Sequence, residues 1–293
     1  MRTIAFSPGH LSGFFEPVMA KRDFAKIGSR GAGISVSLGV ISEVTLKPSI
    51  QQQFNFNLNG TSVPSPVQQT ALQYILGSQP YHVTVNTTVG LPLSQGFGMS
   101  GASALSSTLA LTKLLHRPRT EALKASHYAE IVHKTGLGDV VSQFVGGIEI
   151  RKQPGLPPWG IIEHIPGTYE IVLCVVGEKL DTTTVLSNPA LLQTTSHFGK
   201  LCMKKLLEKP TIETLFTLSQ DFARETGLAQ GHLLEAIETA NSWGMASMCM
   251  LGNSLFAIGK TKELCEHLSP FGPVFECTVD QGGARLLSMA TGT

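Results

Sequence analysis

The chain has 293 residues, and its 22 Lys and Arg residues nearly balance its 21 Asp and Glu residues, giving a formal charge of +1. This length suffices for one large domain or two smaller ones. A charge near zero excludes the strongly basic surface on which general binding of nucleic acid or anionic lipid depends. With 30 Gly residues and only 15% charged residues, the composition indicates a globular protein with many turns, and we expect an enzyme.

Two further properties of the sequence concern location. It contains no run of about 18 apolar residues, so we expect no membrane span. The chain enters the strand-like segment Ile4–Phe6 at once, so we expect no signal peptide. The five cysteines form neither a CxxC pair nor a zinc-binding pattern. They are therefore predicted to be reduced thiols in the core of a cytoplasmic protein.

The first half of the chain is rich in predicted strands. Apolar and polar residues alternate over Ile34–Leu38, Val40–Leu46 and Phe54–Leu58, and the last of these leads into the hairpin dipeptide Asn59–Gly60. A glycine-rich stretch then opens a long apolar helix that ends before Pro118. The other elements predicted here are the helices Val67–Leu76 and Thr120–Lys134 and the strands Tyr81–Val89 and Gly147–Lys152.

A domain boundary is predicted near residue 155. The segment Gln153–Gly160 holds three prolines and two glycines, so we expect one domain over 1–155 and a second over 156–293. Strands and helices are grouped rather than regularly alternated, which favours an α+β fold. The elements predicted beyond the boundary are the strands Glu170–Val176, Ser254–Ile258 and Val274–Thr278 and the helices Ala190–Glu208, Ile212–Gly227 and Leu233–Trp243.

Two glycine patterns imitate nucleotide-binding motifs. Gly96–Gly101 fits the dinucleotide pattern GxGxxG, but the preceding strand ends well before it, at Val89, and the acidic Glu121 lies in a predicted helix. Gly259–Thr261 resembles the end of a phosphate-binding loop, but an apolar strand stands where that loop would be. We therefore expect neither a dinucleotide site nor a P-loop.

The stretch from Pro92, which reads PLSQGFGMSGASALSSTLAL, supports another interpretation. Small residues let the backbone approach a ligand, and the free N–H groups at a helix N-terminus suit phosphate. A capped helix after a flexible loop would give the same spacing, so the pattern alone leaves both interpretations open.

This stretch resembles the second motif of the GHMP kinases, P-x3-G-L-G-S-S-A-A. The positions that match are Pro92, Gly96, Gly98 and Ser100, while Phe97, Met99 and Gly101 replace the usual residues. The first motif, usually A-P-G-K, reads Ser7–His10 here and lacks the lysine that some members use. The third motif, Ser247–Ser254, keeps little of the usual glycine content.

Four other segments are similar to the archaeal pantoate kinases, namely residues 7–17, 28–33, 136–155 and 247–259. The resemblance implies ATP-dependent phosphorylation of the terminal hydroxyl of pantoate to 4-phosphopantoate, for coenzyme A synthesis. It also implies the GHMP kinase fold, with an N-terminal domain like ribosomal protein S5 domain 2 and a C-terminal ferredoxin-like domain.

The resemblance also implies roles for individual residues. The ATP-binding residues would be Pro92, Gly96, Phe97, Gly98, Met99, Ser100, Gly101 and Ala102. Ser100 and Glu130 would bind Mg2+, which takes oxygen ligands. Asp139 would be the base, or the orienting group, for the substrate hydroxyl; a simple helix N-cap is compatible with the same position.

Pantoate carries a carboxylate, for which arginine offers a bidentate partner. The candidates are Arg151, which follows the strand residues Gly146–Ile150, and Arg30, with Ser29, in what we expect to be a glycine-flanked loop over 28–33. His127 lies one helical turn before Glu130 and is a further candidate. For His127 and His10 a structural hydrogen bond is an equal alternative, and His133 is a weaker candidate.

Two alternatives concern the function as a whole. A GHMP kinase for another hydroxy acid, such as mevalonate or homoserine, would share the fold, and so would a non-catalytic nucleotide or metabolite sensor. Retention of Ser100, Glu130 and Asp139 favours an enzyme. We expect pantoate as the small-molecule partner, no nucleic acid or membrane partner, and a homodimer.

Overall fold

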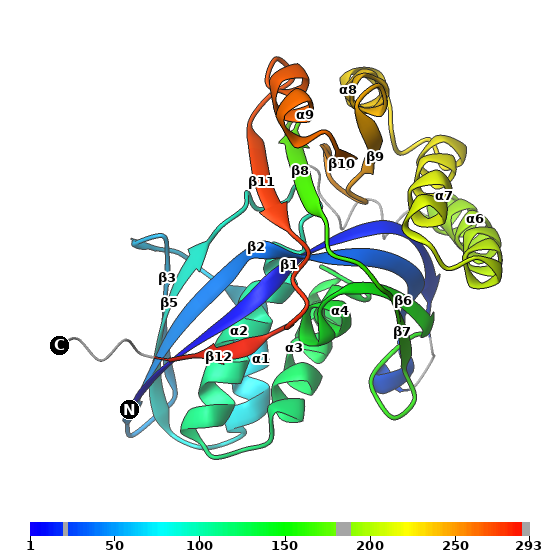
Figure 1. Ribbon diagram of the computed structural model, residues 1–293. Helices are drawn as coiled ribbons and strands as arrows, with labels where there is room; N and C mark the ends of the chain where they lie inside the picture. Colours follow the sequence, from blue (N-terminus) through cyan, green and yellow to red (C-terminus); the bar gives the residue numbers. More distant parts are fainter. Residues whose placement is uncertain (20–22, 180–188, 289–293) are drawn as a thin grey trace.

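The computed structural model describes residues 1–19, 23–179 and 189–288. Within these ranges the strands form two sheets (Figure 1). The eight-stranded first sheet has the order β12-β1-β2-β5-β3-β4, with β6 paired to β2 and β7 to β6. Its strands are β1 (Arg2–Val18), β2 (Gly28–Pro48), β3 (Gln53–Leu58), β4 (Thr61–Ser62), β5 (Tyr81–Val89), β6 (Ile148–Gln153), β7 (Ile161–Ile165) and β12 (Arg285–Leu287).

The described part of the second sheet has four strands in the order β11-β8-β10-β9. They are β8 (Glu170–Val175), β9 (Gly244–Met248), β10 (Ser254–Gly259) and β11 (Val274–Thr278). The helices are η1 (Phe24–Lys26), α1 (Pro66–Leu76), α2 (Met99–Leu114), α3 (Arg119–His133), α4 (Asp139–Val145), α6 (Pro189–Glu208), α7 (Ile212–Glu225), α8 (Gly231–Asn241) and α9 (Thr261–Leu268).

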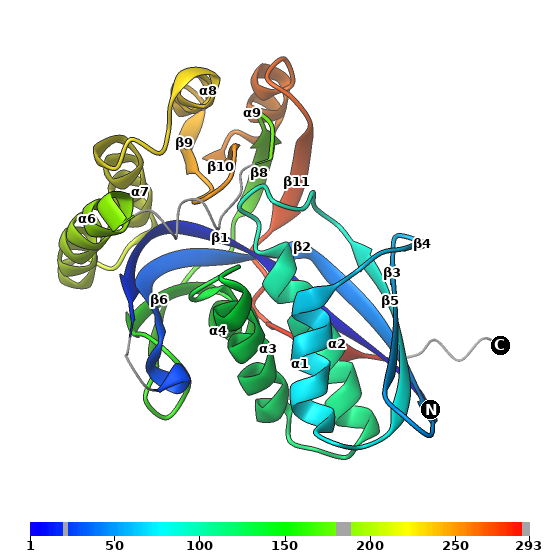
Figure 2. The same cartoon turned by 180° about the vertical axis from the view of Figure 1, so that it is seen from behind.

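Helices cover one face of the first sheet. Figure 2 shows α1, α2 and α3 side by side against it, and α2 contacts β1, β2 and both neighbouring helices. α2 is buried almost all round, and beyond Ser100 its serine and threonine hydroxyls bond to carbonyls one turn back, as Ser107 does to Ser103 at 2.8 Å. Such a helix is held by packing on every side, so its N-terminus is fixed relative to the sheet.

The long ribbon of β1 and β2 departs from the sequence prediction. We expected a glycine-flanked loop over 28–33, and that expectation is wrong, because this segment begins β2 and pairs with β1 on one side and β6 on the other. The glycines serve close packing here. A Cβ on Gly33 would lie 2.5 Å from the ring Nε2 of His10, so only glycine leaves room for that imidazole in the middle of the sheet.

The predicted elements of the second half are confirmed to within a few residues, whereas β7, β9, α9 and β12 were not predicted. The chain leaves the first sheet after Ile165 rather than at residue 155, and it returns with β12, in which Leu287 pairs with Ile4 of β1. The first sheet therefore draws strands from both sides of the predicted boundary. The five cysteines are free thiols, and four of them are buried, as expected.

Candidate active site

The glycine-rich stretch becomes a tight loop that ends at the N-terminus of α2. Gly98 adopts the left-handed conformation (φ 66°) as the residue before Met99, where the helix begins. Gly96 is also left-handed (φ 77°), and a Cβ there would lie 2.8 Å from the Cys249 carbonyl oxygen. Glycine is needed at both positions, because other residues rarely adopt this conformation. The loop thereby presents free helix N–H groups outward.

Neighbouring segments hold this glycine loop in place. The His10 amide donates to the Phe97 carbonyl at 2.9 Å, and the Gln143 side-chain amide donates to the Gly98 carbonyl at 2.8 Å. On the other side, the Ser254 hydroxyl donates to the Gln95 carbonyl at 2.5 Å. The loop is therefore a preformed cradle that is connected to β1, α4 and the start of β10.

A cavity of about 370 Å³ lies beside this loop. Asp139, the first residue of α4, faces it with a side chain that is 26% exposed. The lining comes from β1, the start of β2, the glycine loop and the first turn of α2, the turn before α4, the segment after β8 and the turn before β10. Its residues are Ser12, Phe15, Ser29, Ser94, Gly96, Phe97, Gly98, Met99, Ser100, Thr135, Gly136, Leu137, Gly138, Asp139, Lys179, Met250 and Leu251.

Ser100 and Glu130 meet at one edge of this cavity. The Ser100 hydroxyl donates to Glu130 Oε1 at 2.9 Å, and the Thr135 hydroxyl donates to the same oxygen at 2.7 Å. Burial raises the pKa of Glu130 to about 7, and the charge of Asp139 adds to the rise. A Cβ on Gly136 would lie 2.0 Å from Glu130 Oε2 and 3.4 Å from Asp139 Oδ2. The glycine thus lets the two carboxylates approach each other across this turn.

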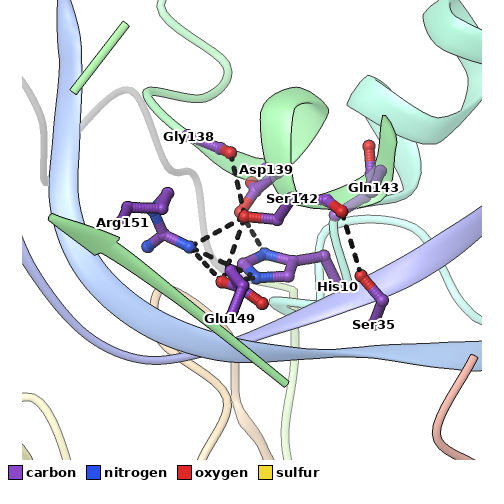
Figure 3. A network of polar contacts seen from close by, with 9 residues as sticks. His10, Ser35, Gly138, Asp139, Ser142, Gln143, Glu149 and Arg151 are labelled. Atoms are coloured by element: carbon purple, nitrogen blue, oxygen red, sulfur yellow. Dashed lines mark hydrogen bonds and ion pairs between the residues drawn. The ribbon is translucent and has the colours of Figure 1, made fainter. Parts of the chain in front are cut away.

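Asp139 is the outermost member of a buried polar network (Figure 3). Its Oδ1 lies 2.7 Å from His10 Nδ1, and His10 Nε2 lies 2.8 Å from Oε1 of Glu149. Arg151 pairs with the same Glu149 oxygen and donates to the Ser142 hydroxyl at 2.9 Å. The His10 and Glu149 side chains are fully buried.

The charges in this network support one another. Burial alone would lower the pKa of His10, but the Glu149 and Asp139 carboxylates outweigh it and raise the pKa to about 9. For Asp139 the effect of burial has the opposite direction and would raise the pKa. The hydrogen bond and charge of His10, together with Arg151, instead hold the pKa of Asp139 below its usual value. Near neutral pH, His10 is an imidazolium that donates to both carboxylates, and Asp139 is ionised.

The structure brings together only some of the predicted site residues. Ser29 lines the cavity with Ser100 and Asp139. Arg151 is 2% exposed and lies behind Gly138, where its Nε is buried without a hydrogen-bond partner among the described residues. A Cβ on Gly138 would lie 2.9 Å from that Nε and 2.6 Å from the Ser29 hydroxyl. Arg151 therefore stands one backbone layer away from the cavity.

Three other candidates point elsewhere. Arg30 is paired with Glu16 at 3.0 Å and donates to the Lys152 carbonyl. His127 Nε2 bonds to the Phe24 carbonyl at 3.1 Å, and burial lowers its pKa, so its contacts here are those of a structural histidine. His133 bonds to the Thr70 hydroxyl. Pro92, Gly101 and Ala102 of the glycine stretch are also not among the cavity-lining residues.

Sequence reasoning missed several residues of the site. Glu149 stands in the predicted strand next to Arg151, yet a glutamate in a strand gives no sign of burial. Met250 and Leu251 line the cavity from the weak third motif, and Gly252 packs against the backbone of Gln95. The segment 247–254 could have indicated this contact. Lys179 lines the cavity from a segment with no motif at all.

Solved structures share this fold. A phosphotransferase related to the coenzyme A biosynthesis pathway matches with a TM-score of 0.89 at 28% identity, with 100% of both chains covered. A homoserine kinase from Cytophaga hutchinsonii has a TM-score of 0.71 at 14% identity, covering 98% of this chain and 97% of that one. Residues 67–147 match the GHMP kinases N terminal domain. The fold and the glycine loop therefore define a GHMP kinase of the predicted α+β class.

Curated relatives narrow this class. The chain is 32% identical to the pantoate kinase of Methanocaldococcus jannaschii over 276 residues, which cover 94% of this chain and 99% of that one. It is 31% identical to the pantoate kinase of Methanospirillum hungatei, with 98% and 96% covered. The chain belongs to the pantoate kinase family, and the protein is a kinase. No described helix is both long and apolar enough to span a membrane.

Proposed function

We propose that the protein transfers the terminal phosphoryl group of ATP to the terminal hydroxyl of pantoate, giving 4-phosphopantoate for coenzyme A synthesis. One observation carries the proposal: an ionised aspartate and a preformed helix N-terminus line the same cavity. Phosphoryl transfer needs a group that orients the attacking hydroxyl and a cradle for the transferring phosphate. The names of the relatives support pantoate as the acceptor, and the geometry of the cavity supports phosphoryl transfer.

The nucleoside would occupy a second cavity, of about 300 Å³, which is lined by residues of β3, the start of α1 and α2. The two cavities share Ser94, Ser100 and Thr135, so one ligand can extend from one to the other. Phe56 and Leu58 of β3 contribute apolar surface to the second cavity, as expected of a site for a planar base. The triphosphate would then pass the N-terminus of α2.

The side chains of Ser100 and Glu130 are suitable ligands for a Mg2+ ion. Glu130 is 3% exposed and pairs with no basic side chain among the described residues, which leaves a buried carboxylate facing only hydroxyl groups. Such a carboxylate is costly unless a cation approaches it. Ser100 and Glu130 would hold the ion. Bound there, it would neutralise negative charge on the phosphate oxygens.

The described residues contain no group of three His, Cys, Asp or Glu side chains arranged to hold a metal alone. This agrees with Mg2+, which usually takes one or two protein ligands and completes its shell with phosphate oxygens and water.

Asp139 would act on the acceptor. His10 occupies its Oδ1, so Oδ2 is the oxygen left to accept the hydrogen of the attacking hydroxyl. A loose transition state has little bonding to the attacking oxygen, so it needs chiefly an oriented hydroxyl, whose proton Asp139 can accept once the new P–O bond is formed. His10 keeps Asp139 ionised, because a neutral acid at this position could not accept that proton.

Ser29 would bind the acceptor on the side of the cavity next to Asp139. Arg151 lies behind Gly138 with a buried, unpartnered Nε, and its positive charge favours a carboxylate placed at this end of the cavity. Arg30 and His127 would stabilise the surrounding walls, through Glu16 and the Phe24 carbonyl, rather than touch pantoate.

The test is ADP release from ATP and Mg2+ with pantoate, mevalonate, homoserine and galactose supplied separately. Turnover with pantoate alone supports the proposal in full. Turnover with another acceptor instead would support the kinase chemistry but would contradict pantoate as the substrate. No turnover with any of the four, while ATP still binds, would favour a nucleotide sensor on the same fold.

A further inference from the structure

We infer that Lys179 contacts the triphosphate of ATP and neutralises the charge of the transferring phosphoryl group. This inference rests on the proposed function, since it assumes that the glycine loop binds the triphosphate. Lys179 belongs to no recognisable sequence motif and lies in the second half of the chain.

The charge balance of the cavity is the first argument. Lys179 is the one basic side chain among the described residues that line it, and Asp139 is the acidic one. The two arginines that the sequence indicated are paired with carboxylates, Arg30 with Glu16 and Arg151 with Glu149. Phosphoryl transfer moves negative charge through this space and requires a cation beside it.

The backbone before Lys179 is fixed to the glycine loop. The Gln95 side-chain amide donates to the Gly177 carbonyl at 3.0 Å, and Gln95 directly precedes Gly96. Gln95 is 4% exposed, so its own side chain is held inside the protein. One buried side chain therefore connects the loop that would cradle the phosphates with the segment that supplies the lysine.

A second connection reaches the turn before β10. Asn253 donates from its side chain to the Glu178 carbonyl at 2.7 Å, and its own carbonyl accepts from the Val176 amide at 2.8 Å. A Cβ on Gly177 would lie 3.2 Å from Asn253 Cβ, which shows how closely the two segments pack. The Lys179 backbone is thus positioned by hydrogen bonds at Val176, Gly177 and Glu178.

The chemistry of lysine favours phosphate over carboxylate. Its ammonium is a point charge on a long flexible chain, suited to a cluster of phosphate oxygens, whereas a carboxylate is matched best by the planar fork of arginine. Lys179 lines the cavity, is exposed, and has no acidic partner among the described residues. It is therefore available to the nucleotide.

The experiment compares Lys179→Ala and Lys179→Arg with a control, Lys204→Ala, which removes an exposed lysine from α6, away from the cavity. Calorimetry measures the binding of ATP and of AMP, with Mg2+ present and no acceptor. Steady-state kinetics then give KM for ATP and for pantoate separately.

We expect Lys179→Ala to weaken ATP binding about tenfold or more, to leave AMP binding unchanged, and to lower kcat. Lys179→Arg should restore most of the loss, and the control should match the parent protein. Unchanged ATP binding, equal losses for ATP and AMP, or a rise confined to the KM for pantoate would each overturn the inference. If the parent protein binds ATP but does not phosphorylate pantoate, the proposed acceptor fails while the binding comparison still decides the role of Lys179.

Discussion

His10 and Asp139 form an ion pair at the base of the cavity, with Nδ1 and Oδ1 separated by 2.7 Å. His10 lies in β1 and Asp139 begins α4, so the contact joins the central sheet to the turn that carries the candidate base. On its other side the same ring contacts Glu149. One buried imidazolium thus fixes both the position and the ionisation of Asp139.

The first prediction concerns Asp139 itself. Asp139→Asn keeps the size of the side chain but removes the charge that accepts the hydroxyl proton. We expect kcat to fall by about 100-fold to 10,000-fold, while ATP binding stays within a few fold of the parent value. Rapid-quench kinetics and calorimetry measure the two quantities. Turnover near the parent rate would remove Asp139 from the chemistry.

The second prediction concerns catalysis by His10. His10→Gln leaves Asp139 and Glu149 buried without the cation between them, so Asp139 loses its fixed orientation. We expect kcat to fall by about 100-fold, with a smaller change in KM for ATP. His133→Gln is a matched control, because His133 bonds to the Thr70 hydroxyl and does not line the cavity. Equal effects of the two changes would contradict a specific role for His10.

The third prediction uses the pH dependence of stability. The pKa of His10 rises from 6.5 in a free side chain to about 9 in the folded protein. A raised pKa in the folded state means that the stabilisation is complete below the unfolded value and is lost as pH rises through about 9. Urea unfolding of the parent protein should show this loss. The loss should be much smaller in His10→Gln, and parallel curves for the two proteins would show that His10 is not charged in the fold.

The fourth prediction concerns Glu130. Glu130→Gln should raise the Mg2+ concentration needed for half-maximal activity at least about tenfold, because a carboxylate ligand is replaced by a neutral amide. The control is Glu121→Gln on the same helix, whose carboxylate pairs with Arg117 at 3.4 Å. A magnesium titration that is the same for both variants would return Glu130 to a structural role.

The fifth prediction separates binding from folding at Arg151. Removing one partner of a buried pair costs about 3–5 kcal/mol where the other charge is left uncompensated. Glu149 would still have His10 as a cationic partner, so we expect Arg151→Ala to lower the free energy of unfolding by less than that amount, and to raise KM for pantoate more than KM for ATP. In the double variant Arg151→Met, Glu149→Gln, stability should largely return, while the KM for pantoate stays high. A recovery of both would mean that Arg151 affects pantoate only through the fold.

Local patterns and the family resemblance together indicated part of the candidate site. Small residues before an apolar helix indicated the loop at Gly96–Gly98. The resemblance assigned Ser100 and Glu130 to one metal, which stays a prediction, and the structure places the two side chains 2.9 Å apart. The loop arises from a short chain segment whose spacing determines its geometry, whereas the Ser100–Glu130 contact depends on the packing of α2 against α3. Local spacing also places Asp139, which follows two glycines and opens a helix.

The remainder depends on long-range pairing, to which a sequence pattern gives no access. His10 meets Asp139 and Glu149 only because β1, α4 and β6 converge, and glycines at 28–33 looked like a loop because their role is to admit other side chains. Lys179 joins the site through hydrogen bonds from Gln95 and Asn253. Arg30 fits a substrate role by residue type, but Glu16 already binds its guanidinium.

The pairing of β12 with β1 has a consequence for re-engineering the chain. Ile4 and Leu287 are cross-strand partners, so the first and the last described strands of the chain, β1 and β12, lie side by side (Figure 1). Near ends of this kind can be joined by a short linker, and new ends can be opened at an exposed turn. The turn at Asn59–Gly60, between β3 and β4, is such a position. A circular permutant opened there would keep the glycine loop, Asp139 and Lys179 on uncut chain.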